Sequence, residues 1–429
     1  MKSRHACIAA LVLSLGSPDL KSETLLSFEA LPELVRERND HVKGSEKISQ
    51  AAEALRPSPL QPFYPTLKAE AGVERFEREL LPQRQDPFWS ATAELNVFRG
   101  GKDYLESQSL SLEASAAQLL SNHAYLDELK KTRLAYADLV YAEGLKKVLT
   151  EAQALNEKNL SSASRRRSSG MATDTDQIEF EIKRQTIQQD LEATELDIHQ
   201  ALASLTVLLG LKHGTKGEFR WPDTFEKISF DLSKISKQAK TTLDFQIEEL
   251  ESKKKDVERK IAARWWVPDV DLYGGYALHT MRDSDEFRRR DRDEVFGGVR
   301  MSLTLFNKGE SLRKQKYESL ISEAQQLRLS QSKRESEAEL EIALKSIEKN
   351  QRLMQGAETS AASSKRYLTQ TLSEYSRGVK NSPDVSAATD KYIEAQSRHL
   401  QIQKDHLIAL SQLFSILGSE HPENNTKKE

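Results

Sequence analysis

Two kinds of hydrophobic pattern alternate along this chain, and the same order of patterns occurs twice. Four stretches carry an apolar residue at every second position, which is typical of strands with one apolar and one polar face. These stretches are residues 66–76, 89–97, 267–278 and 295–305. Between them, apolar residues recur three and four positions apart, as at Leu407, Leu410, Phe414 and Leu417. This second spacing predicts helices that pack as coiled coils.

The two halves of the chain are similar to each other at a constant offset. Four pairs of residues lie 208 positions apart (309 − 101 = 208), namely Phe98 and Phe306, Gly101 and Gly309, Gly170 and Gly378, and Gly210 and Gly418. A fixed offset over such a distance indicates an internal duplication. We therefore interpret the chain as an internal two-fold repeat of one unit, in which two strands are followed by two helices.

Proline is nearly absent between the strand pairs, so each half can hold long helices. We predict helices from Lys102 to about Leu160, from about Thr175 to Leu209, from Glu310 to about Leu372 and from Pro383 to Leu417. Gly170 and Gly378 are predicted to form the tip turns, where each ends a longer helix with a positive φ. Asp174 and Ser382 are predicted to cap the shorter helices, so that each half contains a helical hairpin.

The strand candidates have about the length of tilted membrane strands, which need roughly 9 to 11 residues. Alternation alone fits the half-buried strands of a soluble sheet equally well. The connections within each pair, residues 79–87 and 279–294, are polar or heavily charged, which favours loops that project beyond a membrane. Four strands cannot close a barrel with a usable interior, so a barrel would need several chains.

Composition excludes several functions. Charged residues make up 30% of the chain and aromatic residues 7%, which favours long solvated helices over thick globular cores. A net charge of −3 gives no reason to expect nucleic acid as a partner. Motifs for phosphate binding, zinc proteases and serine hydrolases do not occur, so we expect no enzyme and no cofactor or metal site. His399 and His406 share a helix face seven residues apart, but we do not interpret them as metal ligands.

The N-terminus carries the pattern of an export signal. Residues 1–5 include positive charges, and residues 6–15 form an apolar core that is too short to span a bilayer as a helix. The alternative is a disordered N-terminus, and no clear cleavage motif follows the apolar core. Cys7, the single cysteine, lies inside this segment, so neither a disulfide framework nor a thiolate metal site is available.

The order of elements and two local motifs resemble the TolC family of outer-membrane efflux proteins along nearly the whole chain. The motifs are the strand end from Leu303 to Gly309 and the tip run Tyr375-Ser376-x-Gly378-x-Lys380-x-x-x-Asp384-Val385. The resemblance implies a mixed α and β fold, in which a homotrimer forms an outer-membrane β-barrel with four strands per protomer. A long α-helical coiled-coil barrel continues it into the periplasm.

The resemblance also implies a function and partners. The chain would be a passive exit duct of a tripartite efflux or type I secretion system, located in the cell outer membrane in contact with its lipid. A periplasmic adaptor protein and an inner-membrane pump would dock at the tunnel end, and the cargo could be a drug, a metal ion or a protein. The alternative is a periplasmic coiled-coil scaffold protein without a pore.

In the TolC family, contacts at the tunnel mouth hold the duct closed. By position, the resemblance assigns Tyr375 and Lys380 from the second repeat, Thr175 and Asp176 from the first, and a ring of Asp384 carboxylates that narrows the pore. Better-studied members have Arg in place of Lys380, and Lys cannot make the same planar bidentate pair. A further acidic position of the family is Ala387 here, so we expect a looser or less cation-selective gate.

Each gate residue also has a plain structural interpretation. Asp176 and Asp384 are both predicted at the second position of a helix, where any acidic residue is favoured by the helix dipole. Tyr375 could simply be an aromatic residue that packs in the tip. The run from Arg165 to Arg167 is interpreted as a solvated helix end rather than as an adaptor contact.

These predictions divide the chain into eight segments. They are residues 1–22 (signal peptide), 23–65 (N-terminal helix and equatorial segment), 66–98 (barrel strands one and two), 99–210 (first helical hairpin), 211–266 (equatorial segment and linking helix), 267–306 (barrel strands three and four), 307–418 (second helical hairpin) and 419–429 (disordered C-terminal tail).

Overall fold

The computed structural model describes most of the chain. The described residues are 24–25, 27–58, 61, 64–78, 81–169, 173–211, 219–220, 241–282 and 289–420. The predicted signal peptide, the predicted tip glycine Gly170, most of the predicted C-terminal tail and much of the predicted equatorial segment 211–266 lie outside them.

The chain divides into two compact units. Met1–Arg38, Lys131–Ser229 and Asn350–Ile408 form the first, which we call the tip unit because it holds the turns of both helical hairpins. Asn39–Lys130, Phe230–Lys349 and Ala409–Glu429 form the second, which we call the sheet unit.

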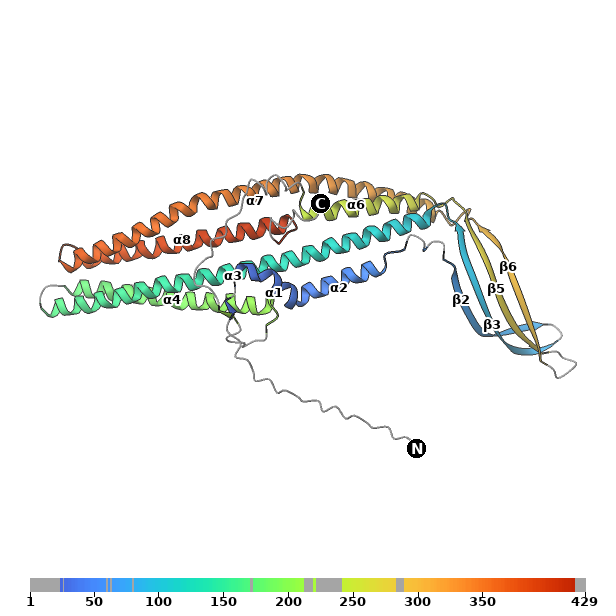
Figure 1. Ribbon diagram of the computed structural model, residues 1–429, viewed down its shortest axis with the longest axis horizontal. Coiled ribbons are helices and arrows are strands. Elements are labelled where there is room, and N and C mark those ends of the chain that lie inside the picture. The colour runs from blue at the N-terminus through green and yellow to red at the C-terminus, as the bar shows by residue number, and fades with distance from the viewer. Residues whose placement is uncertain are drawn as a thin grey trace, which may run out of the picture. The chain divides into compact units, whose positions relative to one another are not determined.

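The helices make up most of the described residues (Figure 1). They are η1 (Phe28–Ala30), α1 (Leu31–Arg38), α2 (Asp40–Ala54), α3 (Lys102–Ser168), α4 (Asp174–Leu208), α6 (Leu243–Ala262), α7 (Glu310–Ser376) and α8 (Ser382–Ile416). Helices α3 and α7 each have 67 residues, and α4 and α8 each have 35. No helix in the described part of the chain combines the length and the apolar composition needed to cross a membrane.

The four long helices occur where the sequence predicts them. Both longer ones run beyond the predicted ends, to Ser168 and Ser376, because a polar or arginine-rich last turn is still a good helix former. The predicted ends, near Leu160 and Leu372, rested on the spacing of apolar residues. That spacing shows how far the packed face extends and not where the helix ends.

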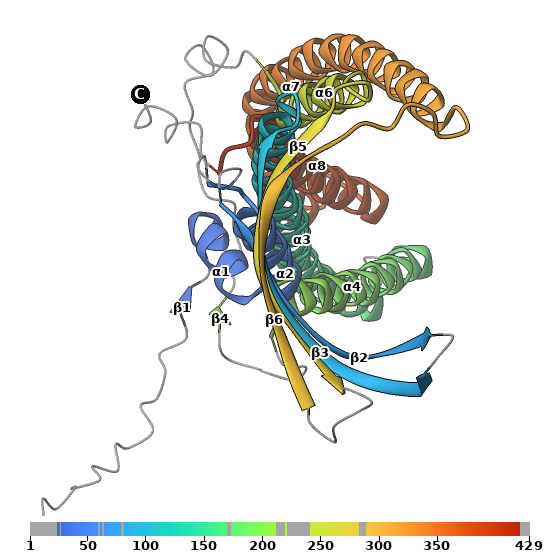
Figure 2. The same cartoon turned by 90° about the vertical axis from the view of Figure 1, so that its right-hand side faces the viewer.

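The strands form one large sheet and one small one. Strands β2 (Thr66–Arg78), β3 (Leu81–Phe98), β5 (Asp269–Arg282) and β6 (Arg289–Ser302) form an antiparallel sheet in the order β2-β3-β5-β6. Strands β1 (Thr24–Leu25) and β4 (Phe219–Arg220) form a short parallel pair in the tip unit. Figure 2 shows that the four long strands curve together in one direction.

The predicted loops within the strand pairs are wrong in extent. Residues 81–87 are part of β3, and most of 279–294 belongs to β5 and β6. The final strand also ends at Ser302, earlier than the predicted Leu305. Backbone hydrogen bonds of a ladder do not depend on side-chain polarity, so charged residues can continue a strand where the alternation stops.

The register of the sheet separates its apolar face from its polar face, as the alternation predicts. Ala91 lies between Ala69 and Tyr276, while the next residue, Thr92, lies between Lys68 and Gly275. The apolar face carries Leu67, Ala69, Trp89, Ala91, Ala93, Leu95, Leu272, Tyr276, Val295, Val299 and Met301. The polar face carries Lys68, Glu70, Ser90, Thr92, Glu94, Asn96, Asp271, Glu294 and Arg300.

Aromatic rings on the polar face lie over glycines of the neighbouring strand. Phe88 pairs with Gly72, and Tyr273 pairs with Gly298. A Cβ atom added to Gly298 would stand 3.0 Å from the hydroxyl oxygen of Tyr273 and 3.2 Å from its Cζ. The glycines therefore leave the space that these rings occupy.

We predict that Gly298→Ala destabilises the sheet by about 1 kcal/mol or more, because the added methyl displaces the Tyr273 ring from a packed position. Gly297→Ala is the matched control, since its Cβ would meet the Tyr273 carbonyl oxygen at 3.5 Å and the Gly274 Cα at 3.9 Å, both ordinary contact distances. Thermal unfolding of the purified variants, followed by circular dichroism, compares the two midpoints. Equal midpoints would show that the packing of the Tyr273 ring does not require a glycine at position 298.

Candidate functional site

The predicted gate residues lie at the ends of the hairpins, and all belong to the tip unit. Thr175 and Asp176 are in the first turn of α4, and Tyr375 is in the last turn of α7. Lys380 is in the turn between α7 and α8, and Asp384 is in the first turn of α8. The tip unit thus brings together elements from both predicted repeats.

Gly378 ends α7 as predicted. Its φ is 77°, which an L side chain rarely adopts. The Gly378 N–H donates to the Tyr375 carbonyl oxygen at 3.0 Å, and the Val379 N–H donates to that of Glu374 at 2.9 Å. These bonds satisfy the last carbonyl groups of the helix and turn the chain toward α8.

The N-cap of α4 is Thr173, so the prediction of Asp174 is wrong by one residue. The Asp176 N–H donates to Thr173 Oγ1 at 3.3 Å, and the Thr173 N–H donates to Asp176 Oδ2 at 3.0 Å. This reciprocal pair is a capping box, and it makes Asp176 the third residue of the helix rather than the second.

The same correction applies to α8. The Asp384 N–H donates to Asn381 Oδ1 at 3.1 Å, and the Asn381 N–H donates to Asp384 Oδ2 at 3.3 Å. Asn381 therefore takes the capping position that was predicted for Ser382. The Lys380 Nζ lies 3.6 Å from Asp384 Oδ1, so this lysine pairs with an acid of its own hairpin.

Asp176 also joins the two hairpins. Its Oδ1 accepts a hydrogen bond from the hydroxyl of Ser382, the buried first residue of α8. The pKa of Asp176 is lowered from its ordinary value of 3.8, chiefly because the Ser382 hydroxyl and then the Thr173 N–H donate to the carboxylate. One carboxylate thus caps α4 with one oxygen and contacts α8 with the other.

Tyr375 is a buried packing residue of the tip, being only 6% exposed. Its ring meets the Phe180 ring edge-on with centroids 5.8 Å apart, and the Arg166 Cζ stands 5.0 Å from the Tyr375 centroid. Burial raises the pKa of the Tyr375 phenol, and the nearby Asp176 adds to the rise while Arg166 opposes it. The ring joins a cluster with Ala163 and Val385.

The observed contacts differ from the pairing that the family resemblance implies. Thr175 is exposed, and the contacts of this turn involve its neighbours Thr173 and Asp176 instead. Asp176 accepts a hydrogen bond from Ser382, and the Tyr375 carbonyl oxygen accepts one from Arg166. The gate role of the five residues stays a prediction.

Sequence reasoning missed several residues of the tip. Arg166, interpreted as part of a solvated helix end, donates hydrogen bonds to the second hairpin. Lys183, which is 7% exposed, forms an ion pair with Asp390, and this joins α4 to α8. The pair could not be predicted, because the prediction of the helices relied on the spacing of apolar residues, and a single lysine and aspartate do not change that spacing.

Of the two helical histidines, His406 is buried and His399 is partly buried. His406 is 7% exposed, and its Nδ1 has no hydrogen-bond partner among the described residues. Burial lowers the pKa of His399 and of His406, which favours the neutral imidazole. No group of three or more acidic, histidine or cysteine residues in the described ranges could hold a metal ion.

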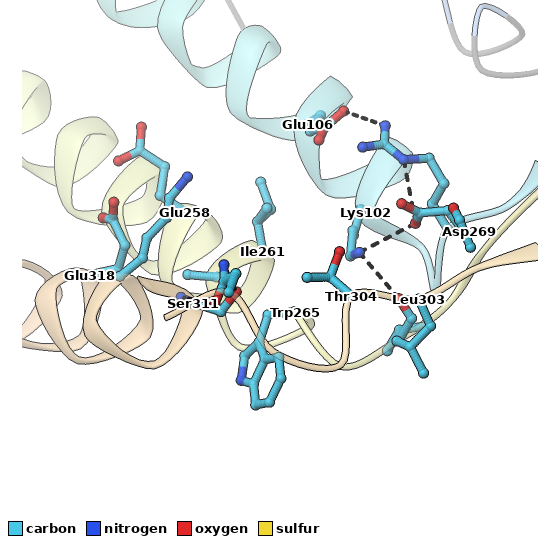
Figure 3. Close-up of a pocket in the computed structure, with 16 residues that line it drawn as sticks. Lys102, Glu106, Glu258, Ile261, Trp265, Asp269, Leu303, Thr304, Ser311 and Glu318 are labelled. Atoms are coloured by element: carbon cyan, nitrogen blue, oxygen red, sulfur yellow. Dashed lines mark hydrogen bonds and ion pairs between the residues drawn. The ribbon is translucent and has the colours of Figure 1, made fainter. Parts of the chain in front are cut away.

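A cavity of about 630 Å³ lies in the sheet unit, where β5 and β6 meet α3, α6 and α7 (Figure 3). The Lys102 Nζ lies 3.3 Å from Asp269 Oδ1 and 3.4 Å from the Val267 carbonyl oxygen. Arg99 contacts the same aspartate, with its Nε 3.7 Å from Oδ1. These cations therefore tie the first residue of β5 to the first turn of α3, which makes the cavity wall a structural junction.

Comparisons with known proteins find a sequence match for the second half of the chain and structural matches for nearly all of it. Residues 235–419 match the family described as outer membrane efflux protein. No curated protein sequence matches the chain. The resemblance to the TolC family is therefore carried in sequence by the second predicted repeat.

Solved structures of outer-membrane channels are similar to the chain along almost its full length. The CmeC channel of Campylobacter jejuni has a TM-score of 0.78 at 15% identity, with 99% of this chain and 97% of that chain covered. VceC of Vibrio cholerae has 0.74 at 16%, covering 91% and 96%. The open state of MtrE of Neisseria gonorrhoeae has 0.72 at 15%, covering 98% and 97%. At these identities the likeness shows the fold.

We predict that the contribution of Asp176 to stability is pH-dependent. Because the folded pKa lies below the ordinary 3.8, this contribution is complete above that value and is lost as the pH falls through the folded pKa. Asp176→Asn should cost about 1 kcal/mol near neutral pH, since the amide is a weaker cap acceptor, and the cost should shrink toward roughly pH 3.

Thermal midpoints of the wild type and Asp176→Asn between roughly pH 7 and 3 measure this difference. Asp197→Asn, at an exposed position of the same helix, is the control and should follow the wild type throughout. A cost of Asp176→Asn that is constant with pH would contradict the assignment.

Proposed function

We propose, from its match to the outer membrane efflux proteins, that this chain is one protomer of a trimeric exit duct through the outer membrane. The family match and the channel fold confirm the resemblance to the TolC family and favour a channel over the scaffold alternative. In this proposal three sheets close one barrel, the hairpins form a tunnel in the periplasm, and cargo passes by diffusion without chemistry on the chain.

The exposed apolar face of the sheet is the observation that carries this proposal. Val295 is 82% exposed, Met301 70% and Val299 69%, and they share the face with Leu67, which is 76% exposed. Exposing so continuous an apolar surface to water is unfavourable, whereas contact between this surface and lipid hydrocarbon carries no such free-energy cost. We assign this face to lipid.

The opposite face supports a water-filled interior. Glu94 Oε1 accepts a hydrogen bond from Arg300 at 2.6 Å, and the Asn96 amide donates to Asp271 at 2.7 Å. Charged and amide groups of this kind need water or polar partners, which a barrel lumen supplies. A barrel wall with lipid outside and water inside accounts for both faces at once.

The two outer strands of the sheet support the assembly. In the order β2-β3-β5-β6, the strands β2 and β6 each have a neighbour on one side only. Unpaired backbone groups are not tolerated inside a membrane, so each edge needs a strand from another chain. Pairing β2 of one protomer with β6 of the next would close the ring, and three protomers would give a twelve-stranded barrel.

Contacts within the tip unit support an entrance at the turns of the hairpins. Asp176, Tyr375 and Arg166 there join the first hairpin to the second. A periplasmic adaptor protein and an inner-membrane pump are the partners that this placement would serve, whether in tripartite efflux or in type I secretion.

The faces of β3 give a direct test of the lipid assignment. Ala91→Lys puts a charge on the apolar face, where a lysine costs about 2–4 kcal/mol at the middle of a bilayer. Ser90→Lys, one residue earlier, puts the same charge on the polar face opposite Glu70. We expect Ala91→Lys to lose most of the heat-resistant trimer from outer-membrane extracts, and Ser90→Lys to retain it.

Unheated electrophoresis of membrane fractions measures the trimer for both variants. Ala91 is exposed in the protomer, so a water-soluble scaffold would accept a lysine there as readily as at Ser90. Equal amounts of trimer in the two variants would contradict the assignment of the apolar face to lipid. A wild-type protein that stays monomeric and soluble would favour the scaffold.

Asp384 tests the proposed entrance. Three carboxylates around a narrow axis attract cations, so Asp384→Ala should lower the ratio of cation to anion permeability severalfold. Asp174→Ala is the matched control, because it also removes one acid from the first turn of a tip helix. Reversal potentials in planar bilayers under a salt gradient measure the ratio, and an unchanged value for Asp384→Ala would exclude this residue from the pore.

A further inference from the structure

Three consecutive arginines end α3, and each has a different environment. Arg165 is exposed. Arg167 is also exposed, and it forms an ion pair with Asp174 and donates to Gln177 at 3.0 Å, so its contacts stay within the first hairpin. Arg166 is partly buried and points to the second hairpin. Arg166 therefore differs from Arg165 and Arg167, because it contacts the second hairpin.

Arg166 binds the end of α7 through backbone atoms. Its Nη1 donates to the Tyr375 carbonyl oxygen at 3.1 Å, and its Nη2 donates to the Ser376 carbonyl oxygen at 2.7 Å. The last carbonyl groups of a helix carry its partial negative charge, which favours a cation there. The planar guanidinium presents two parallel N–H groups, which match two adjacent carbonyl oxygens.

The same guanidinium contacts the side chain of Tyr375. The Arg166 Cζ lies 5.0 Å from the ring centroid, while Phe180 meets this ring from α4. Arg166 thus fixes both the backbone and the ring of one residue of α7. Because the acceptors are backbone carbonyl groups, no side-chain change in the second hairpin removes them.

Other polar contacts between the hairpins in the tip unit go to α8. Asp176 with Ser382 and Lys183 with Asp390 join it to α4, and Glu151 with Tyr392 joins it to α3. Arg166 adds a contact between α3 and α7. Moving the end of the second hairpin away from the first would have to break the Arg166 bonds and expose the buried Tyr375 ring. This contact therefore opposes separation of the hairpin ends.

We propose that Arg166 is a positioning residue of the entrance, which holds the end of α7 against α3 and α4 and so keeps the duct in its closed state. The inference rests on the proposed function and adds to it a residue, outside the five predicted ones, that regulates the opening. Because separating the hairpin ends breaks this contact, losing it removes an interaction that opposes the opening of the entrance.

Single-channel conductance in planar bilayers tests this proposal on the full-length trimer. We expect Arg166→Ala to raise the mean conductance severalfold over the wild type. Arg165→Ala is the matched control, since it removes the same charge one residue away at an exposed position, and it should conduct like the wild type. Arg166→Lys should be intermediate, because an ammonium keeps the charge but loses the planar fork.

The outcomes separate the inference from the proposed function. Wild-type conductance in both Arg166→Ala and Arg166→Lys overturns the inference while the duct itself stands. A wild-type protein without conductance or trimer overturns the proposed function. If Arg166→Ala does not form a heat-resistant trimer, Arg166→Gln keeps the side-chain size, and unchanged conductance of its trimer overturns the inference instead.

Discussion

The placement of an apolar face on a sheet that nothing in the described chain covers is the constraint on which the proposed duct depends. Residues such as Val295 and Val299 are exposed on this face, while Glu94 and Arg300 pair on the other. A sheet that is apolar on one side and charged on the other needs an apolar surrounding on the first side and a polar one on the second. The proposed duct supplies lipid on one side and water on the other, and it pairs the free edges of β2 and β6 with further copies of the sheet.

The proposed gate in the tip unit has a different requirement, because its contacts have to break without unfolding the helices that form it. Asp176 meets this requirement through its two oxygens. Oδ2 holds the N-cap of α4, and Oδ1 accepts from Ser382 of the second hairpin. The contact to Ser382 can therefore be lost while the capping box remains. Likewise, Gly378 and its backbone bonds end α7 without help from the first hairpin.

The sequence predicted those features that repeat along an element. Alternation identified the two faces of the sheet, and the proline-free stretches located all four long helices. The strand ends could not be predicted, since backbone pairing carries β3 through the charged and proline-containing residues 81–87. The caps were wrong by one residue because Thr173 and Asp174, like Asn381 and Ser382, are all good capping residues, and only the backbone angles decide between neighbours. No pattern distinguishes Arg166 from Arg165 and Arg167, because their difference lies in what a distant segment places beside them.

The two unexpected features of the tip have a common physical explanation. Lys380 stands where the TolC family resemblance leads one to expect an arginine that bridges the hairpins, and here its ammonium lies near Asp384 of its own turn. A compact ammonium on a flexible stem suits such a local pair, whereas two adjacent carbonyl oxygens match a planar group with two parallel donors. Arg166 supplies that group from α3 and directs it to the backbone of α7. In this chain a cation of the first predicted repeat, Arg166, therefore joins α3 to α7 through backbone carbonyl groups, beside the Lys183–Asp390 ion pair that joins α4 to α8.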